Sequence, residues 1–344
     1  MRVRLVCAAS LVLLAACAND LDRISLVKTP RVLAMVADPP EAAPGEDVSV
    51  RVLAFDPAGR ELHYAFRACV DPASFFGSFT PDEGNSDTHA MAFCTDLPGN
   101  GNSTVVPGIY TQMLYDQLAT FAPAAGLTAD TLDQLVGSVG IPLQVRVRVT
   151  AVDPMTGAET ATLITAVKTF GLTSRATRTT NPPFVYFSIG DSLFLGGVDR
   201  SSFECTLWAG SPPPVFHASP PQGHGDPVSA FLLPHDDPNT WEETYPYIDY
   251  SRMVRLGREG AYYSWFTTSD VSAPCLHSDC HTIREGDETT SVSSTADPHD
   301  PFALLNRAAE WDLPSTPGTY HFWLVVRDGH LGEAACHTTI EVVP

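Results

Sequence analysis

The chain has 344 residues and a formal net charge of −20 at pH 7, with 20 Lys and Arg against 40 Asp and Glu. This balance argues against a nucleic-acid partner, because phosphate binding requires clustered basic side chains. The length is sufficient for two domains with their own cores. Its 29 Pro and 24 Gly lie between short β-branched and aromatic runs, which is typical of an all-β protein with many turns.

The first sixteen residues have the pattern of an export signal. A basic segment, residues 1–4, precedes an apolar run that is too short to span a bilayer. The run ends in Leu14-Ala15-Ala16-Cys17, which resembles the lipobox of bacterial lipoproteins. That resemblance implies a signal peptide over 1–16, acylation of Cys17 with chains such as palmitate, and a lipidated tether over 17–28. We therefore expect a lipid-anchored protein of the cell envelope, on the outer membrane or the cell surface.

The cysteines favour disulfides. Loss of Cys7 with the signal and acylation of Cys17 leave six of the eight cysteines. An even number in an exported chain is typical of a disulfide framework. The connectivity stays open at this point, and the pairings that we favour are Cys69–Cys94, Cys205–Cys336 and Cys275–Cys280.

A weak internal repeat predicts two similar domains. Residues 145–167 and 320–342 each read as a strand, a turn with Asp and Gly, and a second strand. Each half also has a candidate middle strand that contains aromatic residues, at 62–69 and 261–267. In the first half, strands at 31–37 and 48–55 flank a Pro-rich turn, and this succession is typical of a β-sandwich.

The segments Pro44-Gly45-Glu46 and Pro317-Gly318 resemble those of Ig-like and PKD-like β-sandwich domains of bacterial surface proteins. The Trp-Asp-Phe-Gly-Asp-Gly stretch of PKD domains is absent, so the Ig-like resemblance is the closer one. It implies an Ig-like domain over 29–173, a linker over 174–183 and a second Ig-like domain over 184–344.

Both domains exceed the length of a plain sandwich and are expected to carry insertions. Helical spacing at 108–122 and 128–139 predicts a helical insertion at about 108–140 in the first domain. In the second domain, residues 211–250 and 269–300 are expected to form long loops. Aromatic residues in its loop-like segments suit the recognition of a carbohydrate or a protein. Alternatively, they cover small apolar cores within the insertions. These residues are Trp241, Tyr245, Tyr247, Tyr250 and Trp311.

One tetrapeptide, Gly190-Asp191-Ser192-Leu193, resembles the signature of GDSL esterases, in which the serine is the nucleophile. That family also has an Asp-x-x-His pair and a Gly-x-Asn-Asp block, and this chain has neither. A serine without its base is not activated. We therefore interpret the segment as a turn between two strands.

The segment Cys275-Leu-His277-Ser-Asp-Cys280-His281 has side chains that suit Zn²⁺ or copper. We favour a short disulfide loop over a metal site here, and the haem-attachment pattern fits poorly because four residues separate the cysteines. Histidines are frequent in the second half, which leaves a metal-binding or pH-sensitive surface open. Asp153 and Asp328, in the two matching turns, could help to bind Ca²⁺ or could simply be turn residues.

The prediction is a non-catalytic binding or structural module, anchored to a membrane by its N-terminal lipid. Its expected partner is an envelope protein or carbohydrate, and no cofactor and no catalytic residue are expected. The alternative is a metal-binding protein or envelope hydrolase centred on the second domain.

Overall fold

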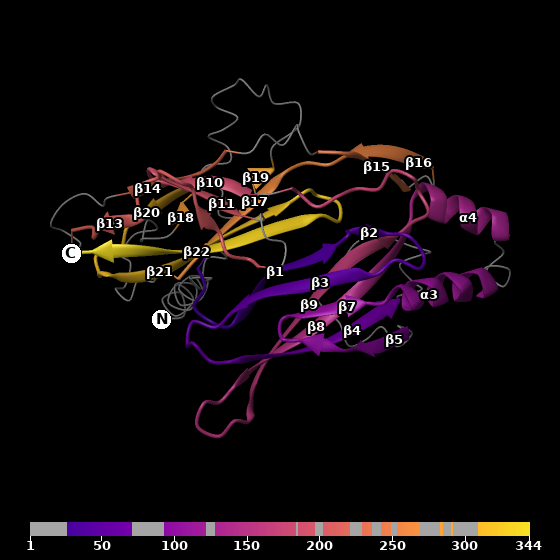
Figure 1. Cartoon of the computed structure of the whole chain (residues 1–344), viewed down its shortest axis with the longest axis horizontal. Helices are drawn as coiled ribbons and strands as arrows, with labels where there is room; N and C mark the ends of the chain where they lie inside the picture. The colour runs from indigo at the N-terminus through magenta and orange to yellow at the C-terminus, as the bar shows by residue number, and fades with distance from the viewer. Residues whose placement is uncertain are drawn as a thin grey trace, which may run out of the picture.

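The computed structural model describes residues 26–70, 93–121, 128–183, 185–196, 202–220, 229–235, 242–248, 253–268, 283–284, 290–291 and 309–344. Strands dominate this part of the chain, and two short helices interrupt them (Figure 1). The predicted all-β class is therefore confirmed.

The first half of the chain is a sandwich of two sheets, with strand orders β1-β3-β7-β6 and β2-β9-β8-β4-β5. Their bounds are β1 (Arg31–Asp38), β2 (Glu41–Ala42), β3 (Val48–Phe55), β4 (Leu62–Val70), β5 (Phe93–Leu97), β6 (Gly99–Asn100), β7 (Ser103–Val106), β8 (Ile141–Val152) and β9 (Glu159–Leu172). Neighbouring strands are antiparallel except for β2, which runs parallel to β9. In chain order, β1, β3, β6 and β7 take the places of Ig strands A, B, D and E. Likewise β4, β8 and β9 take those of C, F and G, with β5 beside C.

The second half repeats this order in two sheets, β12-β11-β10-β14-β20-β18 and β13-β22-β21-β17-β19. Strands β10, β14, β20 and β18 correspond to A, B, E and D, and β17, β21 and β22 to C, F and G. Strand β13 runs parallel to β22, as β2 does to β9. The bounds are β10 (Val185–Ile189), β11 (Ser192–Gly196), β12 (Thr206–Leu207), β13 (Val215–His217), β14 (Ser229–Pro234), β17 (Tyr262–Thr267), β18 (Ile283–Arg284), β19 (Thr290–Ser291), β20 (Ala309–Asp312), β21 (Gly318–Arg327) and β22 (Glu333–Val343).

The insertions differ between the halves. Helices α3 (Gly108–Phe121) and α4 (Ala129–Ser138) lie between β7 and β8, which confirms the predicted helical pair. In the second half, a separate hairpin of β15 (Thr244–Ile248) and β16 (Val254–Arg258) lies between β14 and β17. The stretch 211–250, expected to be a long loop, therefore contains β13, β14 and β15.

Several strands are buried on both faces, because the two sandwiches share a third core. Along β3, Val48, Val50 and Val52 face the interior of the first sandwich. The alternate side chains, Leu53 and Phe55, lie in the shared core together with side chains of β17, β21 and β22. The outer face of the β1-β3 sheet therefore packs against the outer face of the β17-β21-β22 sheet, as Figure 1 shows.

Polar contacts also join the halves. Lys168 of β9 and Glu333 of β22 form a buried ion pair, with Nζ and Oε2 3.1 Å apart. The expected linker, residues 174–183, is held against both halves. Asn181 Nδ2 donates to the Ala37 carbonyl at 2.7 Å, and Asn181 Oδ1 accepts from the Glu333 amide at 2.9 Å. Residues that sequence patterns assign to a polar linker are thus part of the interface.

Two of the favoured disulfides are present in the structure. Cys69–Cys94 joins directly paired positions of β4 and β5, and Cys205–Cys336 joins the segment before β12 to β22. Cys275 and Cys280 lie outside the described residues.

At the N-terminal side, Leu26 and Val27 are buried, and the Val27 amide donates to the Thr267 carbonyl at 2.9 Å. These two residues, expected to lie in the tether, therefore belong to the folded body. No helix in the described part of the chain has the length and apolar character needed to cross a bilayer.

Candidate functional site

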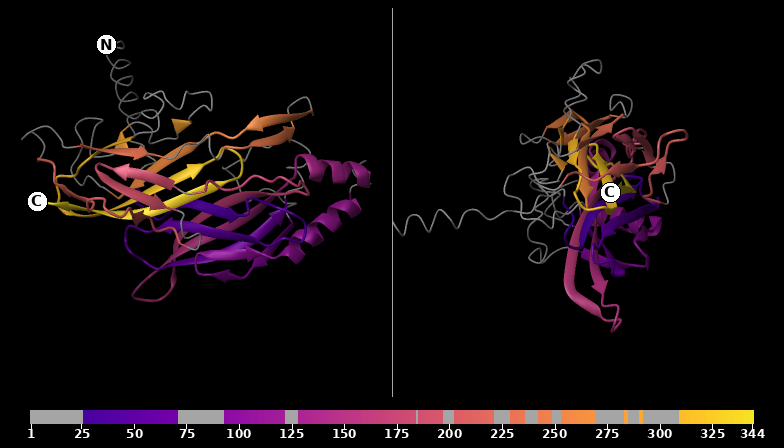
Figure 2. Two further views of the ribbon diagram at one scale, coloured as in Figure 1. Left: turned by 45° about the horizontal axis from the view of Figure 1, so that its top comes forward. Right: turned by 90° about the vertical axis from the view of Figure 1, so that its left-hand side faces the viewer.

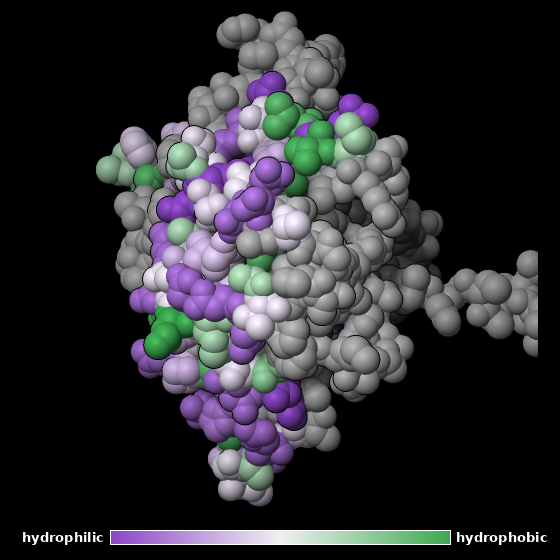
Figure 3. All heavy atoms as spheres, turned by 90° about the vertical axis from the view of Figure 1, so that its right-hand side faces the viewer, coloured by the Kyte–Doolittle hydropathy of each residue, from purple (hydrophilic) through white to green (hydrophobic). Residues whose placement is uncertain are grey.

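The β15-β16 hairpin presents apolar side chains to solvent at one end of the molecule. Figures 1 and 2 place it at the same end as α3 and α4, and they place the C-terminus at the other end. Leu256 is 77% exposed and Val254 53%, and Tyr247 and Met253 are exposed as well. Figure 3 looks onto this end, where hydrophobic residues stand in separate groups among hydrophilic ones. Exposed apolar side chains on a projecting element are typical of a contact surface.

Backbone and carboxylate hydrogen bonds close the base of the hairpin and attach it to the body. The Glu259 amide donates to the Glu243 carbonyl at 2.9 Å, and the Glu243 amide donates to Glu259 Oε2 at 3.0 Å. The Gly260 amide donates to the carbonyl of Asp328 at 2.8 Å, which ties the hairpin to the turn between β21 and β22. The next amide, that of Ala261, donates to Glu242 Oε1 at 3.2 Å.

Ring stacking adds a second attachment. The rings of Tyr245 and His330 stack with their centroids 3.8 Å apart and their planes within 11°. Gly257 is paired with Tyr245 across the hairpin, and a Cβ there would lie 2.9 Å from Tyr245 Cζ, so only glycine leaves the ring in this place. The stack joins β15 directly to the β21-β22 turn.

Buried acids surround these contacts. Glu259 is 2% exposed and Asp328 is fully buried. Burial, reinforced by mutual repulsion with Asp328, raises the pKa of Glu259 to about 8. Burial also raises the pKa of Asp328 to about 7, although the His330 amide and the Lys168 ammonium favour its charged form.

The neighbouring imidazole remains neutral. Burial lowers the pKa of His330 to about 4, and the positive charges of Arg175 and Lys168 act in the same direction. Three atoms of this group have no hydrogen-bond partner among the described residues: Glu259 Oε1, Asp328 Oδ2 and His330 Nδ1. A Cβ at Gly332 would lie 2.0 Å from Asp328 Oδ2, so glycine is required there to admit the carboxyl group. We call Glu259, Asp328, His330 and Tyr245 the clasp.

Sequence reasoning did not identify the clasp. The sequence patterns mark Asp328 as a turn residue and His330 only as one of many histidines, and they do not mark Glu259. Acids at strand ends have the same local pattern whether they face water or a neighbouring element, so no local signal marked them.

The segment that was expected to form a short disulfide loop, with a metal site as the alternative, contains Cys275, His277, Cys280 and His281, and these four residues lie outside the described residues. Within the described ranges, no group of three or more His, Cys, Asp or Glu side chains is arranged to hold a metal ion.

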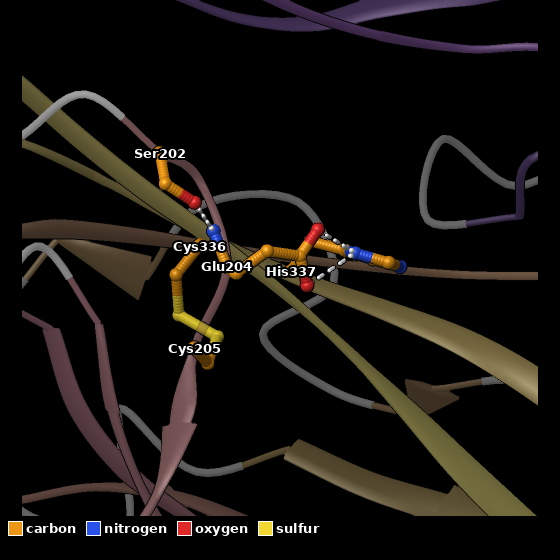
Figure 4. Close-up of a disulfide and its surroundings, with 5 residues drawn as sticks. All are labelled: Ser202, Glu204, Cys205, Cys336 and His337. Carbon is orange, nitrogen blue, oxygen red and sulfur yellow. Dashed lines mark hydrogen bonds and ion pairs between the residues drawn. A yellow bond between two sulfur atoms is a disulfide. The ribbon is translucent and has the colours of Figure 1, made fainter. Parts of the chain in front are cut away.

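Other histidines have polar partners. His337 lies between Glu204 and His321, with Nδ1 3.0 Å from the carboxylate and Nε2 2.9 Å from His321 Nδ1. Figure 4 shows that Glu204 and His337 adjoin the Cys205–Cys336 disulfide. Together these contacts attach the segment before β12 to β22.

The Gly190-Asp191-Ser192 segment is a turn between β10 and β11, as predicted, and Gly190 has a φ of 55°. Ser192 is 2% exposed, and its hydroxyl donates to the Pro212 carbonyl at 3.1 Å. A buried hydroxyl that donates to the backbone does not have the exposed position of an esterase nucleophile.

The aromatic residues singled out above have different environments. Trp311, expected in a loop, is fully buried in β20 and packs against Phe322 with the ring centroids 4.5 Å apart, so that prediction was wrong. Tyr245 and Tyr247 belong to strand β15 and not to a loop; Tyr247 is exposed, and Tyr245 covers His330. Trp241 and Tyr250 lie outside the described residues.

Comparisons with known proteins identify no family. No family model matches the sequence, and no curated protein matches it significantly. Among solved structures, the chain is similar to Escherichia coli alpha-2-macroglobulin at 9% identity and a TM-score of 0.20, covering 92% of this chain and 17% of that one. It is similar to the N-terminal eight Ig domains of Down syndrome cell adhesion molecule at 9% identity and a TM-score of 0.19, covering 92% and 25%. It is also similar to murine CEACAM1b, at 10% identity and a TM-score of 0.20, and the match covers 90% of this chain and 99% of that one.

The chain thus spans a quarter or less of the first two of these proteins. We draw no conclusion about function from TM-scores this low. The class of protein follows from the strand order of the sheets. The protein consists of two Ig-like β-sandwiches joined through a shared core.

Proposed function

We propose that the protein is a lipid-anchored envelope module that binds another protein through the β15-β16 hairpin and catalyses no reaction. The observation that carries the proposal is the set of exposed apolar side chains on this hairpin, whose base is hydrogen-bonded to the body through Gly260 and Asp328. A hairpin held at its base can present such side chains without a large loss of conformational freedom on binding.

The proposed tether joins the body at a point away from the hairpin. Cys17 precedes Leu26 by nine residues, so an extended tether reaches at most about 30 Å from the point where Leu26 pairs with Thr267. Thr267 ends β17, whereas Tyr262 begins β17 next to the clasp. The tether therefore joins the body about 17 Å along the strand from the base of the hairpin.

Aliphatic side chains favour a protein partner over a carbohydrate. Sugars are bound through aromatic faces together with polar groups that match their hydroxyls, whereas Leu256, Val254 and Met253 offer only apolar surface. The matching surface on the partner is therefore expected to be apolar at its centre, with a polar rim.

Cell fractionation and mass spectrometry test the anchor. The wild-type protein is expected in the membrane fraction, starting at Cys17 and carrying a mass increase equal to its acyl chains. Cys17→Ser is expected to lose the increase and the membrane association. An unmodified wild-type chain, or a membrane-bound C17S variant with the same mass as the wild type, contradicts the proposal.

Site-specific photo-crosslinking tests the binding surface. A crosslinker at position 256 is expected to capture one defined envelope protein, whereas a crosslinker at Met155, which is 91% exposed on the β8-β9 turn, is expected not to capture it. The captured protein, once purified, is expected to bind wild type at least about tenfold more tightly than Leu256→Ser. Equal capture at both positions, or equal affinity of the two proteins, overturns the assignment of the hairpin.

The alternative of a metal-binding protein rests on the residue types of the Cys275–His281 segment. Elemental analysis with a free-thiol count on the full chain separates the two functions. Absence of metal and of free thiols supports the binding module with a Cys275–Cys280 disulfide, and stoichiometric zinc or copper with two free thiols supports the alternative.

A further inference from the structure

We propose that the clasp is a pH-sensitive attachment, which holds the hairpin to the body while Glu259 and Asp328 carry protons and releases it when both carboxyl groups ionise. The consequence for binding rests on the proposed function, since the hairpin is the proposed contact surface. The opening itself does not depend on any partner.

The clasp lies where the base of the hairpin meets the body, beside the Glu243 carboxylate, which accepts from the amide and the hydroxyl of Thr180, both at 3.2 Å. Strands β15 and β16 pair only with each other among the described strands. The contacts of the hairpin base run through Glu243 to Glu259, through Gly260 to Asp328, and through Tyr245 to His330. The last two end on the β21-β22 turn, so movement of this turn loosens the hairpin, which the Thr180–Glu243 hydrogen bonds also hold.

Two negative charges cannot be accommodated in this place without rearrangement. Glu259 Oε1 and Asp328 Oδ2 are buried and accept no hydrogen bond among the described residues. The Nδ1 atom of His330 lies 4.0 Å from Glu259 Oε1, beyond hydrogen-bonding distance. The other oxygen of each group does accept a hydrogen bond, from the Glu243 amide and the His330 amide respectively. A buried carboxylate with so few donors still pays a large desolvation penalty, which opening to water removes.

The groups around the two acids do not cancel their charges. The charged and titratable side chains that interact with the clasp from the packed elements are Glu41 of β2, Lys168 of β9, Arg175 of the linker, Glu243 before β15, Tyr262 of β17 and Glu333 of β22. Lys168 and Arg175 are already paired, with Glu333 and Glu41 respectively. Glu41 and Glu243 therefore repel a newly formed charge on Glu259, and Glu333 repels one on Asp328.

The direction of the pH effect follows from proton binding. The pKa values of Glu259 and Asp328 are raised in the closed state, so the closed state binds more protons than the open state. Its stability is highest at low pH and falls as the pH rises through about 7 to 8. The lowered pKa of His330 has the opposite effect on the stability of the closed state, but only at pH values below the ordinary imidazole pKa of 6.5. From pH 6.5 to pH 9 the two carboxyl groups therefore determine the pH dependence.

Hydrogen–deuterium exchange on the full chain tests the clasp. Protection of peptides from residues 244–258, corrected for the intrinsic exchange rate, is expected to fall about tenfold or more between pH 6.5 and pH 9. Peptides from β8 and β9 are expected to keep their protection. The proposal is overturned if hairpin protection is independent of pH, or if all strands lose protection together.

Variants assign the effect to the two acids. Glu259→Gln with Asp328→Asn keeps the shapes and removes the charges, so hairpin protection is expected to stay nearly constant from pH 6.5 to pH 9. Glu61→Gln removes a carboxylate whose side chain is 77% exposed and is expected to behave as the wild type. If the double variant keeps the wild-type pH dependence, the proposal fails.

A third variant needs no change to the acids. Tyr245→Ala removes the stacked ring, and its hairpin is expected to lose protection already at pH 6.5. Unchanged protection there also contradicts the proposal. Because Leu256→Ser tests binding and leaves the clasp intact, loss of the pH effect and failure of the proposed function are distinguishable.

Discussion

The turns that close the two F–G hairpins carry an aspartate at the same position but in opposite environments. Asp153, between β8 and β9, is half-buried at the start of an exposed turn, and its carboxylate accepts from the Met155 and Thr156 amides at 2.8 and 3.1 Å. These backbone hydrogen bonds lower its pKa. Asp328, between β21 and β22, is fully buried against the hairpin base, and burial raises its pKa to about 7.

The difference shows that local sequence sets the turn but not its electrostatics. Both turns use Asp and Gly to reverse the chain, and Gly157 and Gly329 both have positive φ values. In the first half the turn projects into solvent. In the second half it lies against the base of the β15-β16 hairpin and near β9 of the other sandwich, and it has become the centre of the clasp.

The largest expected effect is a loss of stability when the disulfide of either half is removed. Replacing Cys205 and Cys336 by Ser opens a crosslink over 131 residues, and replacing Cys69 and Cys94 opens one over 25 residues. The loop-entropy relation predicts losses of about 5 and about 3.5 kcal/mol respectively. Urea unfolding of both double variants under non-reducing conditions checks this order, and a greater loss in the first half contradicts it.

A second prediction separates the halves by weakening the core that they share. Trp323 is 2% exposed in this core, and Trp323→Ala is expected to cost about 3–5 kcal/mol. Calorimetry is expected to show one unfolding transition for the wild type and two for the variant. Phe170→Leu, a change inside the core of the first sandwich alone, serves as the control and is expected to keep one transition.

The third prediction concerns the pH dependence of stability in the two turns. Asp328→Asn is expected to reduce the loss of stability between about pH 4 and about pH 7, because the native state with its raised Asp328 pKa binds an extra proton over that range and loses stability as the pH rises. Asp153→Asn is expected to lower stability slightly at pH 7. The lowered pKa of Asp153 contributes stability above its ordinary value, and this is lost as the pH falls through the lowered one. Melting temperatures from pH 3 to pH 9 test both, and parallel curves for the two variants refute the contrast.

The smallest effect is expected at the β10-β11 turn, which has no counterpart in the first half. Ser192→Ala removes the hydrogen bond to the Pro212 carbonyl and is expected to cost about 1 kcal/mol. Neither the wild type nor the variant is expected to hydrolyse simple esters. Hydrolysis by the wild type that disappears in S192A would falsify the non-catalytic proposal.

Much of the fold could be predicted from local patterns. The F–G hairpins β8-β9 and β21-β22, the middle strands β4 and β17, and the two helices lie where the sequence analysis expected them. Two favoured disulfides are also present. Alternation, helical spacing and turn residues report the conformation of short segments, and those conformations survive in the tertiary structure.

The clasp and the shared core could not be predicted in this way. The run His321 to Val326 contains apolar residues on both faces of β21, and its pattern does not say which partner covers the second face. Trp311 had the sequence surroundings of a loop aromatic, yet it lies inside the second sandwich. Burial depends on elements far away in the chain.

The sequence by itself determined the repeated F–G hairpins, their turns and the repeat of one sandwich pattern, because these depend on neighbouring residues. Only the tertiary structure decided that the two sandwiches pack face to face, and that Asp328 is buried beside Glu259 while Asp153 faces water. The physical reason is that desolvation and charge repulsion act between atoms that are close in space, whatever their separation in the chain.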